Sequence, residues 1–323
     1  MDKCLSIFLM LFSLSIRAEP NHELTYKLKA SVVKVHVTTK SGGHGVGSGV
    51  VVDKDIVATN CHVLANATGV NITKFGESFA PVALRADWKH DICLLRFQYL
   101  DMNPVELGDA EHLQYEQEIF SIGFPGGPPK PQVIYGNVKA LYPYEDSMII
   151  RTDAAFVMGA SGSPVFDAQG RLIALSTFKS PGRLAYFYNV PVKWVKALMS
   201  TPETTSLRTE QTPFWDAPED IRPYFMQVVG PYLNQDWQAL EKISQAWVNR
   251  ESGNAEAYYY LAYAKYNLNK QPEAMTHFDM VLKLHPNHPA TRIAQALIAK
   301  GKGSVLATKD MDGCSVESYS QGC

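Results

Sequence analysis

The spacing of apolar residues in this chain changes once, near residue 200, and this change limits the folds that the chain can adopt. Before that point, short apolar runs alternate with glycine and proline clusters such as PGGPP at 125–129. Many short, evenly spaced strands indicate a β-barrel or sandwich. The apolar runs lie at 31–37, 49–52, 56–58, 79–84, 92–97, 118–122, 133–141, 148–152, 163–166, 172–176 and 185–190, and residues 192–199 favour a short closing helix. The sequence therefore predicts an all-β domain over residues 28–200.

A second, helical domain is predicted after a linker. Residues 201–216 are polar and threonine-rich with two prolines, which is typical of a linker. From 217 to 302, apolar residues recur at intervals of three and four, which predicts a small all-α domain. Its residues match the spacing of a tetratricopeptide (TPR) unit of about 34 residues, with a weaker copy before it. The matching positions are Tyr258, Leu261, Ala262, Ala274, Phe278 and Pro286. A generic helical hairpin bundle is the alternative, and the tail at 303–323 has no predicted structure.

The N-terminus indicates export. The apolar run at 4–16 follows Lys3 and precedes Ala18. It is too short to span a bilayer as a helix and is typical of a signal peptide over residues 1–18. An uncleaved anchor is the alternative. We expect a secreted or periplasmic protein with no membrane span in the mature chain. The net charge of −2 gives no indication of nucleic-acid binding.

Three residues carry the candidate chemistry: His62 in VATNCHVL, Asp91 in HDICLLR and Ser161 in GASGSP. A serine hydroxyl needs an adjacent base, and His62 is the natural base because imidazole titrates near neutral pH. Asp91 would orient the ring and stabilise the imidazolium. The order His, Asp, Ser is that of the chymotrypsin fold. The trio therefore predicts acyl transfer from a peptide bond to Ser161.

The GASGSP segment also predicts how the transition state is stabilised. Gly159 permits a tight turn that aims the backbone N–H groups of Gly159 and Ser161 into one oxyanion hole. Ser163 is the rival nucleophile and Asp153 the rival carboxylate. Asp153 lies so close to Ser161 in sequence that we assign it a structural role.

Export implies an oxidising compartment, in which cysteines pair. Cys61 precedes His62, and on a strand Cys93 would share the face of Asp91. If His62 and Asp91 touch, these two thiols are close together. We predict the pairs Cys61–Cys93 and Cys314–Cys323, with two buried free thiols and an unpaired tail as the alternative.

Seven segments occur in a familiar order: GSGVVVDKDIVATNCHVL, HDICLLRF, VELGDAEHL, SIGFPGG, VIYGNVKAL, RTDAAFVMGASGSPVF and FYNVPVKWV. Together they resemble the trypsin-like serine proteases of the HtrA/Deg kind over residues 28–200. The resemblance implies a double β-barrel, no cofactor, no metal, and protein or peptide substrates.

The resemblance also implies a substrate pocket with Ala155 at its base and Ser176, Thr177 and Phe178 in its wall. Ser176 would also hydrogen-bond Asp91. No acidic residue lies at the base, so we expect a preference for small or medium apolar side chains.

This chain departs from the family in three ways. Ser163 stands where the family usually has glycine, and Ala160 removes the aspartate used in zymogen activation. TPR-like helices occupy the place of a PDZ domain, where they either bind a protein partner or pack on the barrel. The prediction is a serine endopeptidase, and the alternative is a catalytically silent scaffold that binds partners through its helices.

Overall fold

The computed structural model describes residues 22–296, except residues 75, 182–184, 208–210, 290–291 and 293. The predicted signal peptide at 1–18, the pair Cys314–Cys323 and the tail at 303–323 lie outside the described residues.

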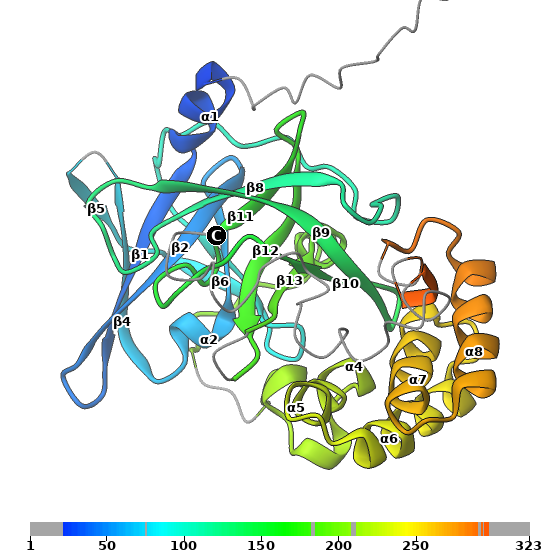
Figure 1. Ribbon diagram of the computed structural model, residues 1–323. Helices are drawn as coiled ribbons and strands as arrows, with labels where there is room; N and C mark the ends of the chain where they lie inside the picture. Colours follow the sequence, from blue (N-terminus) through cyan, green and yellow to red (C-terminus); the bar gives the residue numbers. More distant parts are fainter. Residues whose placement is uncertain are drawn as a thin grey trace, which may run out of the picture.

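Two β-units and a group of helices make up the described part of the chain (Figure 1). A short helix, α1 (His22–Lys29), precedes the first strand. The first unit is a seven-stranded sheet in the order β5-β4-β1-β2-β3-β7-β6. Its strands are β1 (Val32–Thr39), β2 (His44–Asp53), β3 (Ile56–Thr59), β4 (Ala67–Lys74), β5 (Glu77–Phe79), β6 (Ala83–Asp87) and β7 (Ile92–Arg96), with α2 (Cys61–Leu64) after β3.

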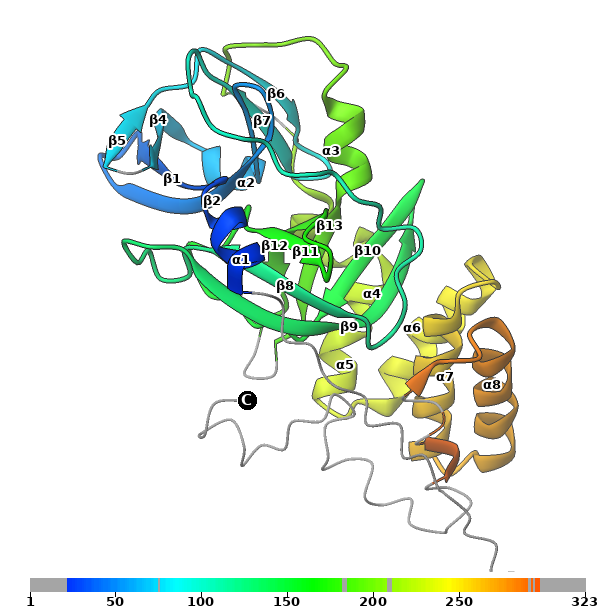
Figure 2. The same ribbon diagram turned by 90° about the horizontal axis from the view of Figure 1, so that it is seen from above.

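The second unit is a closed barrel in the order β10-β13-β12-β11-β8-β9. It consists of β8 (Glu118–Gly123), β9 (Gln132–Tyr144), β10 (Ser147–Thr152), β11 (Pro164–Asp167), β12 (Leu172–Lys179) and β13 (Phe187–Pro191), and it is followed by α3 (Val192–Leu198). Figure 2 shows the barrel between the first sheet and the C-terminal helices. The all-β region and its closing helix thus form where the sequence predicts them.

Three local expectations were wrong or incomplete. The run at 79–84 is split between β5 and β6, because Pro81 has no N–H for a strand ladder. Strand β4 is largely polar, so no apolar run in the sequence predicts it. The first unit forms an open sheet instead of a closed barrel.

The predicted linker covers the free edge of that sheet. Leu84 of β6 and Thr204 exchange two backbone hydrogen bonds of 2.8 Å each. Glu203 forms ion pairs with Arg85 at 3.1 Å and Arg96 at 2.8 Å. Residues 203 and 204 are therefore held against β6 and β7.

The C-terminal helices pack against the barrel on the side of β9. They are η1 (Phe214–Asp216), η2 (Glu219–Ile221), α4 (Tyr224–Gln227), α5 (Val229–Leu233), α6 (Trp237–Arg250), α7 (Ala255–Asn267) and α8 (Gln271–Leu284). Helices α6 and α8 are both 14 residues long, and their first residues, Trp237 and Gln271, are separated by one TPR period. This spacing supports a helical repeat, while its identity as a TPR module stays a prediction.

Barrel and helices share one hydrophobic core. The ring of Tyr142 in β9 stacks on Phe225 of α4, with centroids 4.7 Å apart, and lies 6.4 Å from Trp247 of α6. Helix α7 is buried along nearly its whole length. Packing on the barrel is therefore one role of these helices, and nothing in the described residues identifies a partner for them.

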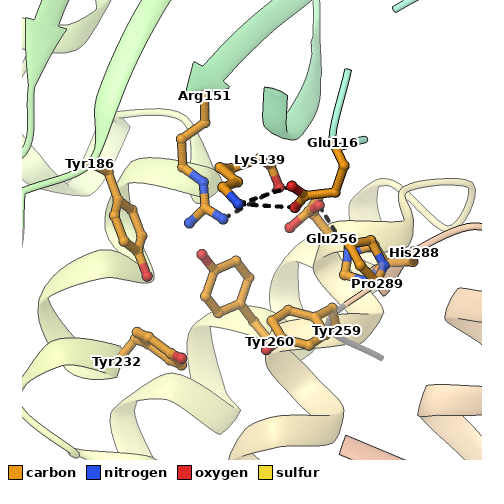
Figure 3. A pocket seen from close by; sticks show the side chains of 10 residues that line it. All are labelled: Glu116, Lys139, Arg151, Tyr186, Tyr232, Glu256, Tyr259, Tyr260, His288 and Pro289. Carbon is orange, nitrogen blue, oxygen red and sulfur yellow. Dashed lines mark hydrogen bonds and ion pairs between the residues drawn. The ribbon is translucent and has the colours of Figure 1, made fainter. Parts of the chain in front are cut away.

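A polar cluster closes the same junction (Figure 3). Glu256 of α7 is buried and accepts hydrogen bonds from Tyr115 Oη at 2.6 Å and His288 Nε2 at 3.2 Å. Arg151 of β10 faces the same cavity and lies over the Tyr186 ring at 4.3 Å. Burial disfavours the charge of Glu256, but the bonds from His288 and Tyr115 and the positive charge of Arg151 outweigh it and lower its pKa.

Replacing Glu256 by glutamine is expected to lower the free energy of unfolding by about 1–3 kcal/mol at pH 7, because a buried charged acceptor is lost. A carboxyl with a lowered folded-state pKa stabilises the fold above its unfolded value of about 4.3 and loses this effect as pH falls through the folded value. The variant should therefore lose less stability on acidification below that pH than the wild type. Urea unfolding from pH 3 to 7 measures this. Equal effects in the exposed control Glu219→Gln would contradict the prediction.

No helix among the described residues has the length and apolar character needed to cross a membrane.

Candidate active site

His62 and Asp91 are in direct contact. His62 Nδ1 lies 2.6 Å from Asp91 Oδ2, and the His62 backbone N–H donates to Asp91 Oδ1 at 2.8 Å. The Asp91 side chain is completely buried, whereas the His62 side chain is 26% exposed. A buried carboxylate thus holds one ring nitrogen, and the other side of the ring remains free to meet a second group.

The local backbone explains this contact. Asp91 lies in the turn before β7 with φ 63°, and not on the strand itself. Its carbonyl oxygen accepts a hydrogen bond from Asn60 Nδ2 at 2.9 Å. Strands β3 and β7 pair so that Thr59 lies opposite Cys93. This register places the two segments that end in His62 and begin with Asp91 side by side.

Cys61 and Cys93 form a disulfide across the same two segments. The bond links residues 32 apart in sequence. The predicted proximity of Cys61 and Cys93 assumed that Asp91 lies in a strand. Asp91 lies before the strand, and the pairing of β3 with β7 brings the two thiols together.

Replacing both Cys61 and Cys93 by alanine is expected to lower the free energy of unfolding by about 2–4 kcal/mol, because the unfolded chain regains the entropy of the closed loop. Urea unfolding of oxidised wild type and the double variant measures the difference. Reductant should shift the wild type toward the variant and leave the variant unchanged. Identical midpoints in all samples would contradict the prediction.

Ser161 lies in a tight turn that packs on the segment preceding His62. Gly162 has φ 84°, and a Cβ there would overlap Ser48 O and lie 2.5 Å from Thr59 Oγ1. The Ser161 carbonyl accepts from Ser48 N at 2.8 Å. Among the described residues, Ser161 Oγ makes no hydrogen bond to another group, so the backbone alone positions it.

Ser48 is a positioning residue that the sequence reasoning missed. Its hydroxyl donates to the Gly159 carbonyl at 2.8 Å and accepts from Phe124 N at 3.0 Å. It therefore holds the turn at both Gly159 and Ser161. The signal in the sequence was its place between two glycines at the start of GSGVVVDKDIVATNCHVL.

Two peptide groups of the turn have free donors. Met158 O accepts from Gly126 N at 2.7 Å, and Ala160 O accepts from Ser163 N at 2.8 Å. Because a trans peptide is planar, each anchored carbonyl turns the following N–H the opposite way. These donors are the N–H groups of Gly159 and Ser161, neither of which has an acceptor among the described residues. Gly159 has φ 92°, and a Cβ there would lie 2.6 Å from Phe124 O. This turn can therefore offer two backbone donors to an oxyanion.

Trp215 contacts the pair from the predicted linker. Its Nε1 donates to Asp91 Oδ2 at 3.0 Å, and its ring lies edge-on to His62 with centroids 5.4 Å apart. Ser176, expected at this position, instead has its hydroxyl 3.5 Å from Ser121 Oγ. That expectation was wrong because the bend of β12 turns Ser176 into the barrel. Two adjacent aromatic residues, Phe214 and Trp215, in an otherwise polar segment were the available signal.

The structure buries most of the predicted pocket wall. Ser176, Thr177 and Phe178 are 2%, 2% and 6% exposed, while Ala155 is exposed. Thr177 Oγ1 accepts from Asn60 Nδ2 at 3.1 Å. The cavity in Figure 3 lies at the junction of barrel and helices, away from the Ser161 turn. The side-chain preference of the site therefore stays a prediction.

The rival residues lie elsewhere. Ser163 is 1% exposed, and its side chain faces Gly123 inside the barrel. Asp153 forms an ion pair with Lys139 at 3.4 Å. His90, next to Asp91 in sequence, binds Asp87 with Nδ1 at 2.6 Å.

The two β-units and the helical region define a chymotrypsin-like fold followed by helices. Residues 47–175 match the family model of the trypsin-like peptidase domain. The chain is similar to the Rv3671c protease from M. tuberculosis in its active form, with a TM-score of 0.53, 18% identity, and coverage of 58% of this chain and 88% of that one. It is also similar to the HtrA-type protease AlgW with tripeptide, with a TM-score of 0.50, 22% identity, and coverage of 55% and 61%. At these identities the likeness concerns the fold alone.

Curated relatives carry the sequence similarity. The periplasmic serine endoprotease DegP of Escherichia coli (strain K12) is 31% identical over 169 residues, which are 48% of this chain and 35% of DegP. The relatives are named serine proteases or endoproteases. This chain spans about a third of the length of the curated relatives it matches.

Proposed function

We propose that this protein is a serine endopeptidase that cleaves peptide bonds through an acyl-enzyme. The contact between His62 Nδ1 and the buried carboxylate of Asp91 carries the proposal. The turn that holds Ser161 packs on Thr59 and Asn60, just before His62, and among the described residues it has an unbonded serine hydroxyl and two free backbone donors. The sequence match to the trypsin-like peptidase domain over residues 47–175 supports the same conclusion.

In this mechanism Ser161 Oγ attacks the carbonyl carbon while His62 Nε2 takes its proton. The negative charge on the carbonyl oxygen is met by the N–H groups of Gly159 and Ser161. Asp91 stabilises the imidazolium, which then donates its proton to the leaving amine. Water, with His62 again as base, releases the carboxylic acid and restores Ser161. No cofactor takes part in these steps.

The substrates are proposed to be extended or unfolded segments of exported proteins. The name of DegP, a periplasmic endoprotease, and the predicted signal peptide at 1–18 support export. Ala155 is exposed and apolar, which supports acceptance of apolar side chains.

Fluorophosphonate labelling of the mature protein, followed by mass mapping, tests the proposal. The expected result is one modified residue, Ser161, together with casein digestion that is lost in Ser161→Ala. Folded protein that never labels, even with unfolded substrate present, would instead favour a scaffold whose helices bind a partner.

A further inference from the structure

Trp215 reaches the proposed catalytic pair from outside the two β-units. It lies in η1, near the end of the predicted linker whose Thr204 pairs with the edge of β6. Its neighbour Phe214 anchors the segment: the Phe214 N–H donates to Lys89 O at 3.0 Å, and its ring is buried against Tyr144 with centroids 4.7 Å apart. Trp215 is therefore held by tertiary contacts.

The indole is fixed in two directions. Its ring stacks on Phe178 of β12, with centroids 5.5 Å apart and planes 15° apart. It meets the His62 ring edge-on, at 88°. A ring packed between these neighbours has little freedom to rotate, so its N–H points steadily at Asp91.

The bond from Trp215 completes the set of partners around Asp91. Oδ1 accepts from the His62 backbone N–H, and Oδ2 accepts from both His62 Nδ1 and Trp215 Nε1. With the carboxylate fully buried, water cannot replace a missing donor. Loss of the indole N–H would leave Oδ2 with one partner and allow the carboxylate and the His62 ring to rotate.

We propose that Trp215 is a positioning residue for Asp91 and His62, so that the segment joining the barrel to the C-terminal helices forms part of the catalytic unit. The inference rests on the proposed function. It assigns to residues after position 200 a direct role in the geometry of the site.

The test is Trp215→Phe in the full chain, which keeps an aromatic ring and removes the N–H. The rate constant for inactivation by a fluorophosphonate should fall about tenfold to a hundredfold, the range of one hydrogen bond to a buried charged group. Trp247→Phe is the matched control, because Trp247 Nε1 also donates to a carboxylate, Glu251 Oε2 at 2.8 Å. The control should label at the wild-type rate, with thermal unfolding showing both variants folded.

A double-mutant cycle separates positioning from general packing. If Trp215 acts through Asp91, Trp215→Phe should cost little further in an Asp91→Asn background. The same factor in both backgrounds, or a wild-type rate for Trp215→Phe alone, overturns the inference.

A measurement independent of activity distinguishes the two proposals. The His62 Nδ1 proton, observed by NMR in protein labelled with ¹⁵N-histidine, should exchange faster with water in Trp215→Phe than in wild type. If wild type fails to label at Ser161, the proposed function fails, and this exchange rate alone decides the positioning role. Unchanged exchange then overturns it.

Discussion

Replacing Ser161 by alanine is expected to lower kcat for peptide hydrolysis by about 10⁶ and to abolish fluorophosphonate labelling, as loss of the nucleophile does in comparable enzymes. The backbone donors of Gly159 and Ser161 remain, so substrate binding should change far less than kcat. Casein digestion and gel-based labelling of the wild type and variant measure both effects.

Ser163→Ala is the matched control. Its hydroxyl faces Gly123 inside the barrel, and its removal leaves the turn intact. We expect labelling within about twofold of wild type, because the Ser163 hydroxyl makes no hydrogen bond among the described residues, so its loss leaves no donor or acceptor unpaired. Labelling that persists in Ser161→Ala and disappears in Ser163→Ala would move the nucleophile to Ser163.

Replacing Asp91 by asparagine is expected to lower kcat by about 10⁴ with little change in fold. Asp91 accepts three hydrogen bonds, from two groups of His62 and from Trp215. An amide offers one oxygen and one NH₂, so at least one donor loses its acceptor. If the NH₂ faces Nδ1, the ring is held in the tautomer that cannot accept the proton of Ser161. Steady-state kinetics on a peptide library substrate measures the loss.

Asp87→Asn provides the comparison for Asp91. Asp87 also binds a histidine, with Oδ2 2.6 Å from His90 Nδ1, but it lies outside the proposed site. Its replacement should leave kcat unchanged to within about twofold. Equal losses in the two variants would show that the effect is structural, and would remove Asp91 from the mechanism.

Local sequence patterns predicted most strands because buried strand positions are occupied by apolar residues. The predictions failed where the apolar run was absent or interrupted. Strand β4 lies between β5 and β1 but has several polar residues, so no apolar run marks it. Pro81 interrupts an apolar run that would otherwise pass for one strand. The edge of the first sheet at β6 is paired with Thr204, which is distant in sequence from its partner Leu84.

Some residues of the candidate site were predicted from local sequence patterns, and others were found only in the structure. His62, Asp91 and Ser161 stand in distinctive segments, so their order alone predicted the chemistry. Ser48 lies in the same segment as His62 without a chemical role that the segment reveals, and Trp215 lies in no such segment. The importance of both arises from contacts made across the fold. The residues of the pocket wall were predicted from their alignment with the family. That alignment does not show that the Ser176 hydroxyl points toward Ser121 and away from Asp91.

The sequence by itself determined the spacing of apolar residues in each region, the candidate reactive side chains and the glycines that a tight turn needs. These are local properties, because they depend on neighbours within a few residues. Only the tertiary structure decided which donors surround Asp91, which carbonyls anchor the Ser161 turn and how the helices share a core with the barrel. Most of those contacts join residues far apart in the chain, and their partners are selected by packing and by the need to satisfy most buried polar groups.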